Sequence, residues 1–201
     1  MAVVSIKNKL RRGNLLVGNA FFMPSAFESI ATATGTGSST SLTFSSIPST
    51  YQHLQIRGIG KATATTSRSG LLSVQCNSDT GANYAAHRLR GDGTSVLAGG
   101  NASTTYTYFQ DCLAYSKTAT PDMANIFGAF IIDIHDYSST SKYKTIRGFG
   151  GVDANYSSVD FEINLISGLW MNTAAINSIT LNANDPLTTT TTFALYGIRG
   201  A

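Results

Sequence analysis

The chain has 201 residues, of which 42% are hydrophobic and 12% are charged, and its formal net charge is +3. This length fits one all-β domain, and the apolar fraction is enough for a buried core. The charged fraction is about half of the roughly 25% typical of soluble domains. Ser, Thr, Asn and Gly take its place, which disfavours helices. No stretch approaches the ~20 apolar residues that span a bilayer, so we expect no membrane partner.

Residues 1–25 are predicted to form an extended N-terminal arm ahead of a single domain at 26–201. The first half of the arm is basic, and the other ten of the 14 Lys and Arg residues are nearly balanced by 11 Asp and Glu residues. Four cations without interleaved aromatic residues are a weak signal for nucleic acid, so we expect no nucleic-acid partner. The basic positions are Lys7, Lys9, Arg11 and Arg12.

The second half of the arm is apolar and ends at Pro24. It is too short to build its own core and too apolar to remain free in water, so it should order against something else. A strand added to the domain's own sheet and an anchor along a neighbouring subunit both remain open. The apolar positions are Leu15, Leu16, Val17, Phe21 and Phe22.

From residue 27 onwards, extended segments follow one another at regular intervals, separated by turn residues. Residues 93–103 are weakly patterned and predict a surface loop. The segments before the middle of the chain are Phe27 to Thr34, Ser41 to Ile47, His53 to Ile59, Leu71 to Cys76, Tyr84 to Leu89 and Thr105 to Tyr115.

The stretch 124–151 predicts a central hairpin. Its apolar run ends at Ile134, a polar turn follows at 136–141, and a second extended segment runs from Lys142 to Phe149. Val159 to Leu165 then alternates strictly, with Asp160, Glu162 and Asn164 as the polar set, which predicts a half-buried strand. Three more strands are expected in Ile166 to Asn172, Ile176 to Leu181 and Phe193 to Ile198.

Many short strands without a helix or a repeat of fixed period favour an all-β fold. The arrangement expected is a jelly-roll-like antiparallel β-sandwich with an extended N-terminal arm, ahead of a propeller or a solenoid.

Catalytic chemistry is not indicated. The chain has no GxSxG motif, and His53, His87 and His135 have no spacing that suggests a triad. Asp160 and Glu162 share a strand face as any solvated pair would. We therefore expect no enzyme activity and no cofactor.

A metal site is not indicated either. Asp133 and His135 could contribute ligands, but strand ends often carry such residues in solvated positions. Residues 77–83 are rich in oxygen ligands, yet Arg88 stands where a calcium loop needs Glu, so an Asp-Gly turn is expected. Cys76 and Cys112 read as buried free thiols rather than a disulfide.

Four tyrosines lie on predicted strand faces or loop edges, near Asn and Asp residues. Aromatic rings beside such groups form sugar-binding surfaces, although the same rings could pack at sheet edges with their hydroxyl groups in water. The possible glycan contacts are Tyr106, Tyr108, Tyr137 and Tyr143.

Several segments resemble a family of small virion structural proteins of tailed bacteriophages, common among phages of cyanobacteria and marine bacteria. They cover nearly the whole chain and consist of turns and strands. They are SIKNK with LLVGNA, FESIAT, FSSIPSTYQHLQIRG, NSDTGANYAAHRLRGDG, IIDIHDYSSTSKYKTIRG, SGLWMNTAAINSITL and FALYGIRG.

The resemblance implies a virion location and a non-enzymatic role, most of all as a capsid decoration or cement protein. Such a protein would contact the major capsid protein or other virion proteins through its arm, and would form a homo-oligomer, with a trimer favoured. The alternative is a tail-fibre or receptor-binding module that recognises host surface glycan, although the chain has no heptads and no collagen-like repeat. The family offers no active-site residues to transfer.

Overall fold

The computed structural model describes residues 25–63, 69–115, 123–154 and 161–200, together with strand residues 16–17 and 20–21. All regular secondary structure within these ranges consists of β-strands, which confirms the all-β class. The strands of the domain are β3 (Phe27–Thr34), β4 (Ser41–Phe44), β5 (His53–Ala62), β6 (Ser69–Cys76), β7 (Tyr84–Gly91), β8 (Val96–Thr104), β9 (Thr107–Tyr115), β10 (Gly128–Ile134), β11 (Lys144–Gly151), β12 (Ile163–Trp170), β13 (Ile179–Ala183) and β14 (Thr192–Ile198).

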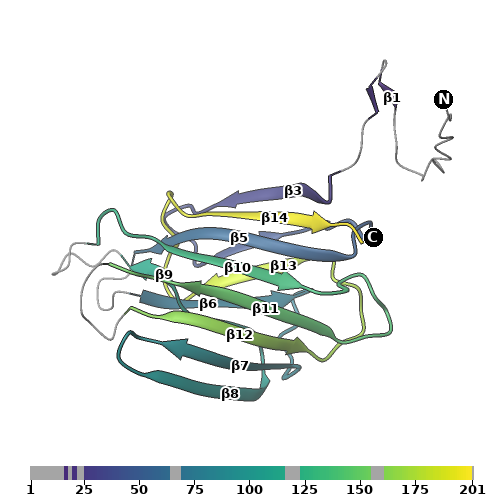
Figure 1. The fold of residues 1–201 in the computed structure, drawn as a ribbon. Coiled ribbons are helices and arrows are strands. Elements are labelled where there is room, and N and C mark those ends of the chain that lie inside the picture. The colour runs from purple at the N-terminus through teal and green to yellow at the C-terminus, as the bar shows by residue number, and fades with distance from the viewer. Residues whose placement is uncertain are drawn as a thin grey trace, which may run out of the picture.

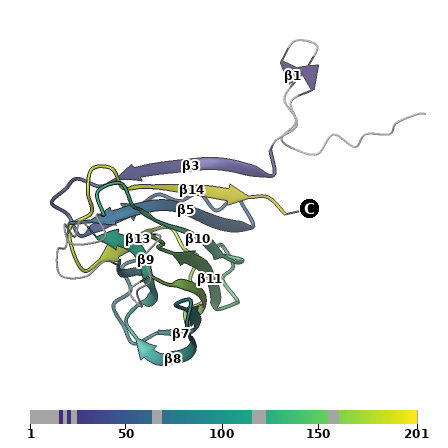
Figure 2. The same ribbon diagram turned by 60° about the vertical axis from the view of Figure 1, so that its left-hand side comes forward.

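The strands form two packed layers, as expected for a β-sandwich. The large sheet has the order β3-β14-β5-β10-β11-β12-β7-β8, and the small sheet has the order β4-β13-β6-β9. The large sheet faces the viewer in Figure 1, and Figure 2 shows the domain from the side. The layers join where Lys61 and Ala62, at the end of β5, pair in parallel with Ala114 and Tyr115 of β9. All other pairings between the described strands of the domain are antiparallel.

The finer jelly-roll expectation is not established, because the layers are unequal whereas a jelly roll pairs two Greek keys. One local prediction is wrong: most of residues 93–103 form the edge strand β8 rather than a loop. From Val96 to Ser103 this strand is exposed at every residue. Since alternation in a sequence reflects burial of one face, a strand with neither face buried carries no such pattern.

The small sheet packs onto the middle of the large one through β9. Phe109 and Thr107 of β9 are buried, and they approach Gly148 of β11 and Gly168 of β12 so closely that a Cβ atom at either glycine would overlap them. Glycine is therefore required where the layers meet, because any side chain would push β9 outward.

Both cysteines are free and buried, as the sequence predicts. Cys76 lies on β6 and Cys112 lies on β9. Burial raises the pKa of the Cys76 thiol to about 12, so this sulfur stays protonated at neutral pH.

The oxygen-rich segment 77–83 is a turn whose carboxylate serves the fold. Asp79 accepts hydrogen bonds from the Trp170 indole N–H at 2.8 Å, from the Asn83 amide at 2.9 Å and from the Gly81 backbone N–H at 2.8 Å. Trp170 is fully buried and belongs to β12. The turn that leads from β6 towards β7 is thereby fastened to a distant strand of the large sheet.

In the arm, β1 (Leu16–Val17) pairs with β2 (Ala20–Phe21) as a separate two-stranded sheet. Of the partner-binding residues predicted there, Leu16, Val17 and Phe21 are described only by their backbone. The others lie outside the described residues, so the role of the arm stays a prediction. They are Lys7, Lys9, Arg11, Arg12, Leu15 and Phe22.

Replacing Asp79 with Asn should lower the free energy of unfolding at pH 7 by about 1–2 kcal/mol, because charged hydrogen bonds are lost. The hydrogen bond from Trp170, and then that from Asn83, lowers the pKa of Asp79 in the folded protein. The stabilisation is therefore complete above the ordinary carboxyl pKa of about 3.9 and disappears as the pH falls through the folded-state value. Chemical denaturation at a series of pH values should show the two proteins converging in acid.

The matched control is Asp185→Asn, on the turn after β13. At pH 7 its free energy of unfolding should match that of the wild type within about 0.5 kcal/mol. A stability gap for Asp79→Asn that stays constant into acid would contradict the proposed contribution.

Candidate interaction surface

The first half of strand β12 turns two large apolar side chains outward. Ile163 is 53% exposed and Leu165 is 55% exposed, whereas Asn164 is fully buried and Ile166 is 2% exposed. At Ile163 and Leu165 this reverses the orientation that a half-buried alternating strand predicts, whereas Phe161 of the same apolar set is buried as expected. Glu162 of the predicted polar set is buried as well, while Val159 and Asp160 lie outside the described residues.

Neighbouring strands extend this apolar surface in register. Ile131 of β10 lies opposite Phe149 of β11, Phe149 lies opposite Leu165, and Leu165 lies opposite Leu89 of β7. All four side chains are more than a third exposed. Directly opposed residues on adjacent strands are close enough to touch, so the four form a continuous stripe.

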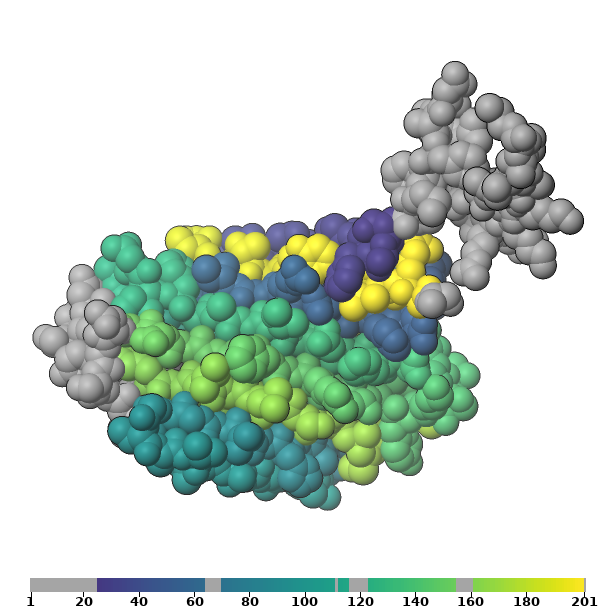
Figure 3. All heavy atoms as spheres, in the orientation of Figure 1, coloured from purple at the N-terminus to yellow at the C-terminus, as the bar shows by residue number. Residues whose placement is uncertain are grey.

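A second row runs beside the stripe, with Ile59 of β5 at one end and Val96 of β8 at the other. The seven exposed apolar side chains of both rows are called the outer apolar face below. Figure 3 views the molecule from this side. The members are Ile59, Leu89, Val96, Ile131, Phe149, Ile163 and Leu165.

A hollow of about 710 Å3 opens at one end of the outer apolar face. Gly151 and Gly91 flank Ile163 in the second row, and with Phe149 and Phe161 they line the hollow. A Cβ atom at Gly91 would meet nothing closer than the Ile163 side chain, so the face has relief there that a partner's side chain could fill.

A polar row borders the apolar stripe. Gln55 donates to Asp133 at 2.7 Å and accepts a hydrogen bond from Arg57 Nε at 2.7 Å. Asp133 also lies opposite Arg147 across the β10–β11 pair. The border is therefore polar, with its charges of opposite sign placed side by side.

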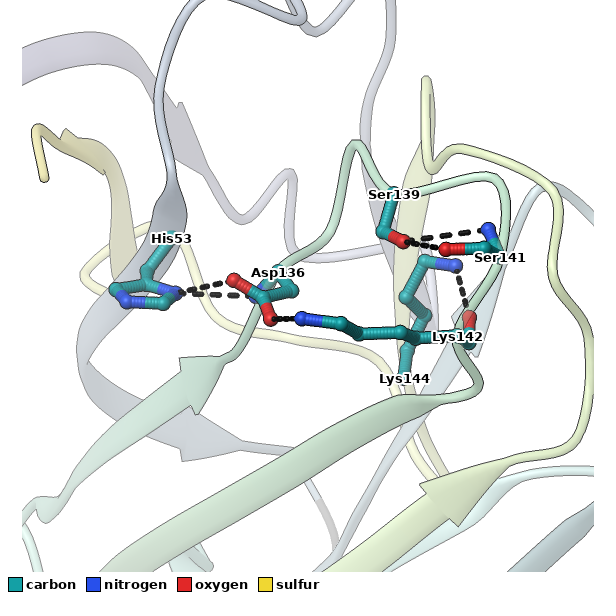
Figure 4. A network of polar contacts seen from close by, with 6 residues as sticks. All are labelled: His53, Asp136, Ser139, Ser141, Lys142 and Lys144. Carbon is teal, nitrogen blue, oxygen red and sulfur yellow. Dashed lines mark hydrogen bonds and ion pairs between the residues drawn. The ribbon is translucent and has the colours of Figure 1, made fainter.

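A cluster of polar side chains lies at the β10–β11 hairpin (Figure 4). Lys142 donates to the Asp136 carboxylate at 2.7 Å, and the Asp136 backbone N–H donates to His53 Nδ1 at 3.0 Å. The hydrogen bond from Lys142 lowers the pKa of Asp136. Lys144 is buried and donates to the Lys142 carbonyl at 2.8 Å.

This cluster is built as a structural brace. His53 Nδ1 accepts a backbone N–H, and the Asp136 carboxylate oxygen lies 3.7 Å from it, so the carboxylate does not orient the ring as it would in a triad. The Ser139 hydroxyl accepts from the Ser141 backbone N–H at 3.3 Å. Among the described residues, no three His, Cys, Asp or Glu side chains are grouped as metal ligands.

The predicted glycan contacts are separated by the fold. Tyr106 is 36% exposed and lines a groove together with the nearly buried Tyr108. Tyr143 is exposed just before β11, away from this groove. Tyr137 is fully buried, with its hydroxyl donating to the Pro48 carbonyl, so it does not reach a surface-bound sugar in this structure.

The sequence did not single out Leu89, Ile131, Phe149 or Leu165 as interaction residues. Their signal was alternation, and alternation identifies two faces without showing which one is inside. The residues that show which face is inside are the alternate ones of the same strands. Gly148 and Gly168 leave room for β9, and Ile166 between them in the sheet is buried.

Comparisons with protein-family models, curated proteins and solved structures give no match. Within the described residues, no helix is long and apolar enough to cross a bilayer.

Because Leu165 points outward and Ile166 points inward, truncating these two neighbours should lower the free energy of unfolding by very different amounts. Ile166→Ala should cost about 2–5 kcal/mol of unfolding free energy, because it empties a core position. Leu165→Ala should cost less than about 1 kcal/mol, because half of that side chain is already in water. Denaturation of dilute protein, where association does not contribute, measures both, and an equal or inverted pair of losses would contradict the assigned orientation.

Proposed function

We propose that this chain is a non-enzymatic structural protein of a phage virion, most consistent with a capsid decoration or cement protein. The observation that carries the proposal is the outer apolar face across β5, β10, β11, β12, β7 and β8. The resemblance of the sequence to virion proteins of tailed phages supplies the setting. His53 and Asp136 make hydrogen bonds within the protein, to the Asp136 backbone and to Lys142, and this supports a role without catalysis.

The extent of the face supports burial in an assembly. Seven large side chains, each showing on the order of 80–100 Å2 to water, present about 550–700 Å2 of apolar surface. The largest apolar patch of a typical monomer is about 300–600 Å2, and a standard interface buries about 800 Å2 per partner. The face is therefore close to the size of one complete protein interface.

The occupant that we propose for this face is a second copy of the chain. Arg57, at one end of the stripe, is the only charged residue that the described pairings place in the two apolar rows. The polar border sets Asp133 beside Arg147. Two such faces can meet without like-charge repulsion, and depletion of charge is typical of interface centres.

The arm is proposed to attach the resulting oligomer to the shell. Its apolar half would be covered by the major capsid protein or another virion protein, and its basic half would meet acidic shell surface. Several arms acting together would gain avidity over one arm alone. The expected trimer would need contacts beyond the pairing of like faces, and it stays a prediction.

The double variant Phe149→Asp with Leu165→Asp should weaken self-association by more than about tenfold, because it places carboxylates inside an apolar contact. Sedimentation velocity over a range of concentrations measures the change. Tyr143→Asp is the control, since it adds a carboxylate at an exposed aromatic residue outside the stripe. A wild-type protein that remains monomeric, or a double variant that associates as the wild type does, would contradict the assignment.

Deleting residues 1–23 should leave a folded domain that still associates with itself but no longer sediments with isolated phage shells. Circular dichroism checks the fold, and co-sedimentation with empty shells measures attachment. If the truncated protein still decorates shells, the arm is not the anchor.

A second candidate function is a tail-fibre or receptor-binding module that recognises host surface glycan. The feature that favours it is the groove that brings Tyr106 and Tyr108 together. A protein that ignores empty shells and binds host envelope polysaccharide would favour this function over decoration.

A further inference from the structure

A polar groove crosses the side of the domain away from the outer apolar face. Two hollows of about 540 and 300 Å3 share Leu71, Thr105 and Tyr106, so they form one groove. Its floor includes Ser73 and Gln75 of β6, which alternate with the core residues Leu72 and Val74 and therefore point away from the large sheet. Residues of the edge strand β8 form one wall.

Side-chain amides in the groove are held in place by hydrogen bonds. The Gln75 amide nitrogen donates to the Thr105 carbonyl at 3.0 Å, and the Asn182 amide nitrogen donates to Gln75 at 3.2 Å. Asn101 and Gln110 add two more amides to the lining. Amides both donate and accept, which suits the hydroxyl groups of a sugar.

Tyr106 lies where the two hollows meet and is the aromatic residue most exposed in the groove. Its backbone carbonyl accepts a hydrogen bond from the Thr104 hydroxyl at 2.9 Å, which holds it against the end of β8. An amphipathic ring at this position offers a flat surface to a sugar ring.

Arg88 is the one charged side chain among the described residues that line the groove. Its guanidinium lies over the Tyr108 ring, 5.9 Å from the ring centre. The buried Nη1 has no hydrogen-bond partner among the described residues. A buried donor without an acceptor is costly, and a guanidinium is matched best by a carboxylate or a phosphate.

We propose that this groove binds an acidic glycan segment, with Tyr106 stacking on a sugar ring and Arg88 donating to the anionic group of that sugar. The shared chemistry is an anion on a sugar ring, supplied by a uronic acid or by a phosphorylated sugar. The proposal does not depend on the outer apolar face, which belongs to the other sheet surface. A protomer docked through that face keeps the groove accessible.

The test uses the full chain and three oligosaccharide probes: a galacturonic acid tetrasaccharide, its methyl ester, and a phosphorylated mannan oligosaccharide. The ester keeps the ring and removes the charge. Titration calorimetry should show binding to at least one acidic probe, and at least about tenfold weaker binding to the ester. No binding to either acidic probe at millimolar concentration, or equal binding to acid and ester, overturns the proposal.

Two variants locate the binding. Tyr106→Ala should weaken binding of the acidic probe about five- to tenfold, and Arg88→Gln should remove the preference for acid over ester. Tyr143→Ala is the control for Tyr106, and thermal unfolding shows whether Arg88→Gln remains folded. Because Tyr106 is exposed, it tests the site even if the arginine variant does not fold. Unchanged binding by Tyr106→Ala would refute the assigned groove.

The proposed groove and the outer apolar face can be tested independently of each other. The double variant Phe149→Asp with Leu165→Asp should bind the acidic probe as the wild type does, whereas Tyr106→Ala should associate with itself as the wild type does. Loss of probe binding in the first variant would show that the ligand site is not the groove.

Discussion

The contact between β9 and the glycine-lined inner face of β11 and β12 determines much of this structure. Phe109 and Thr107 occupy the space above Gly148 and Gly168. The side of each strand that carries these glycines therefore faces the interior. Successive side chains of a strand point to opposite faces. Phe149 and Leu165 are therefore directed outward by the same contact that closes the core.

The domain consequently presents two surfaces with different chemistry. The large sheet offers branched and aromatic side chains in register, bordered by Gln55, Asp133 and Arg147. The groove between the small sheet and strands β7 and β8 offers amides, hydroxyl groups, two tyrosine rings and a guanidinium. An apolar surface suits burial against another protein, and a polar concave surface suits a hydrated ligand, so the two need not compete.

The fold class and most strands could be predicted from the sequence, because turn residues and period-two patterns mark each strand directly. The buried free thiols and the turn at Asp79 could be predicted for the same local reasons. The outer apolar face could not be predicted. Its position depends on which alternate set of side chains in each strand faces β9, and β9 is distant in the sequence. Edge strand β8 escaped detection because burial, the source of the pattern, is absent there.

Strand β8 also ends the large sheet with nine residues that include neither Lys nor Pro, the residues with which many proteins block unwanted pairing at a sheet edge. Its far side presents backbone donors and acceptors to any extended chain of suitable length. A strand added at this edge would extend the sheet sideways. A protomer packed on the outer apolar face would lie in the perpendicular direction. In the proposed capsid role, one protomer would then join neighbours both at its sheet edge and on its broad face.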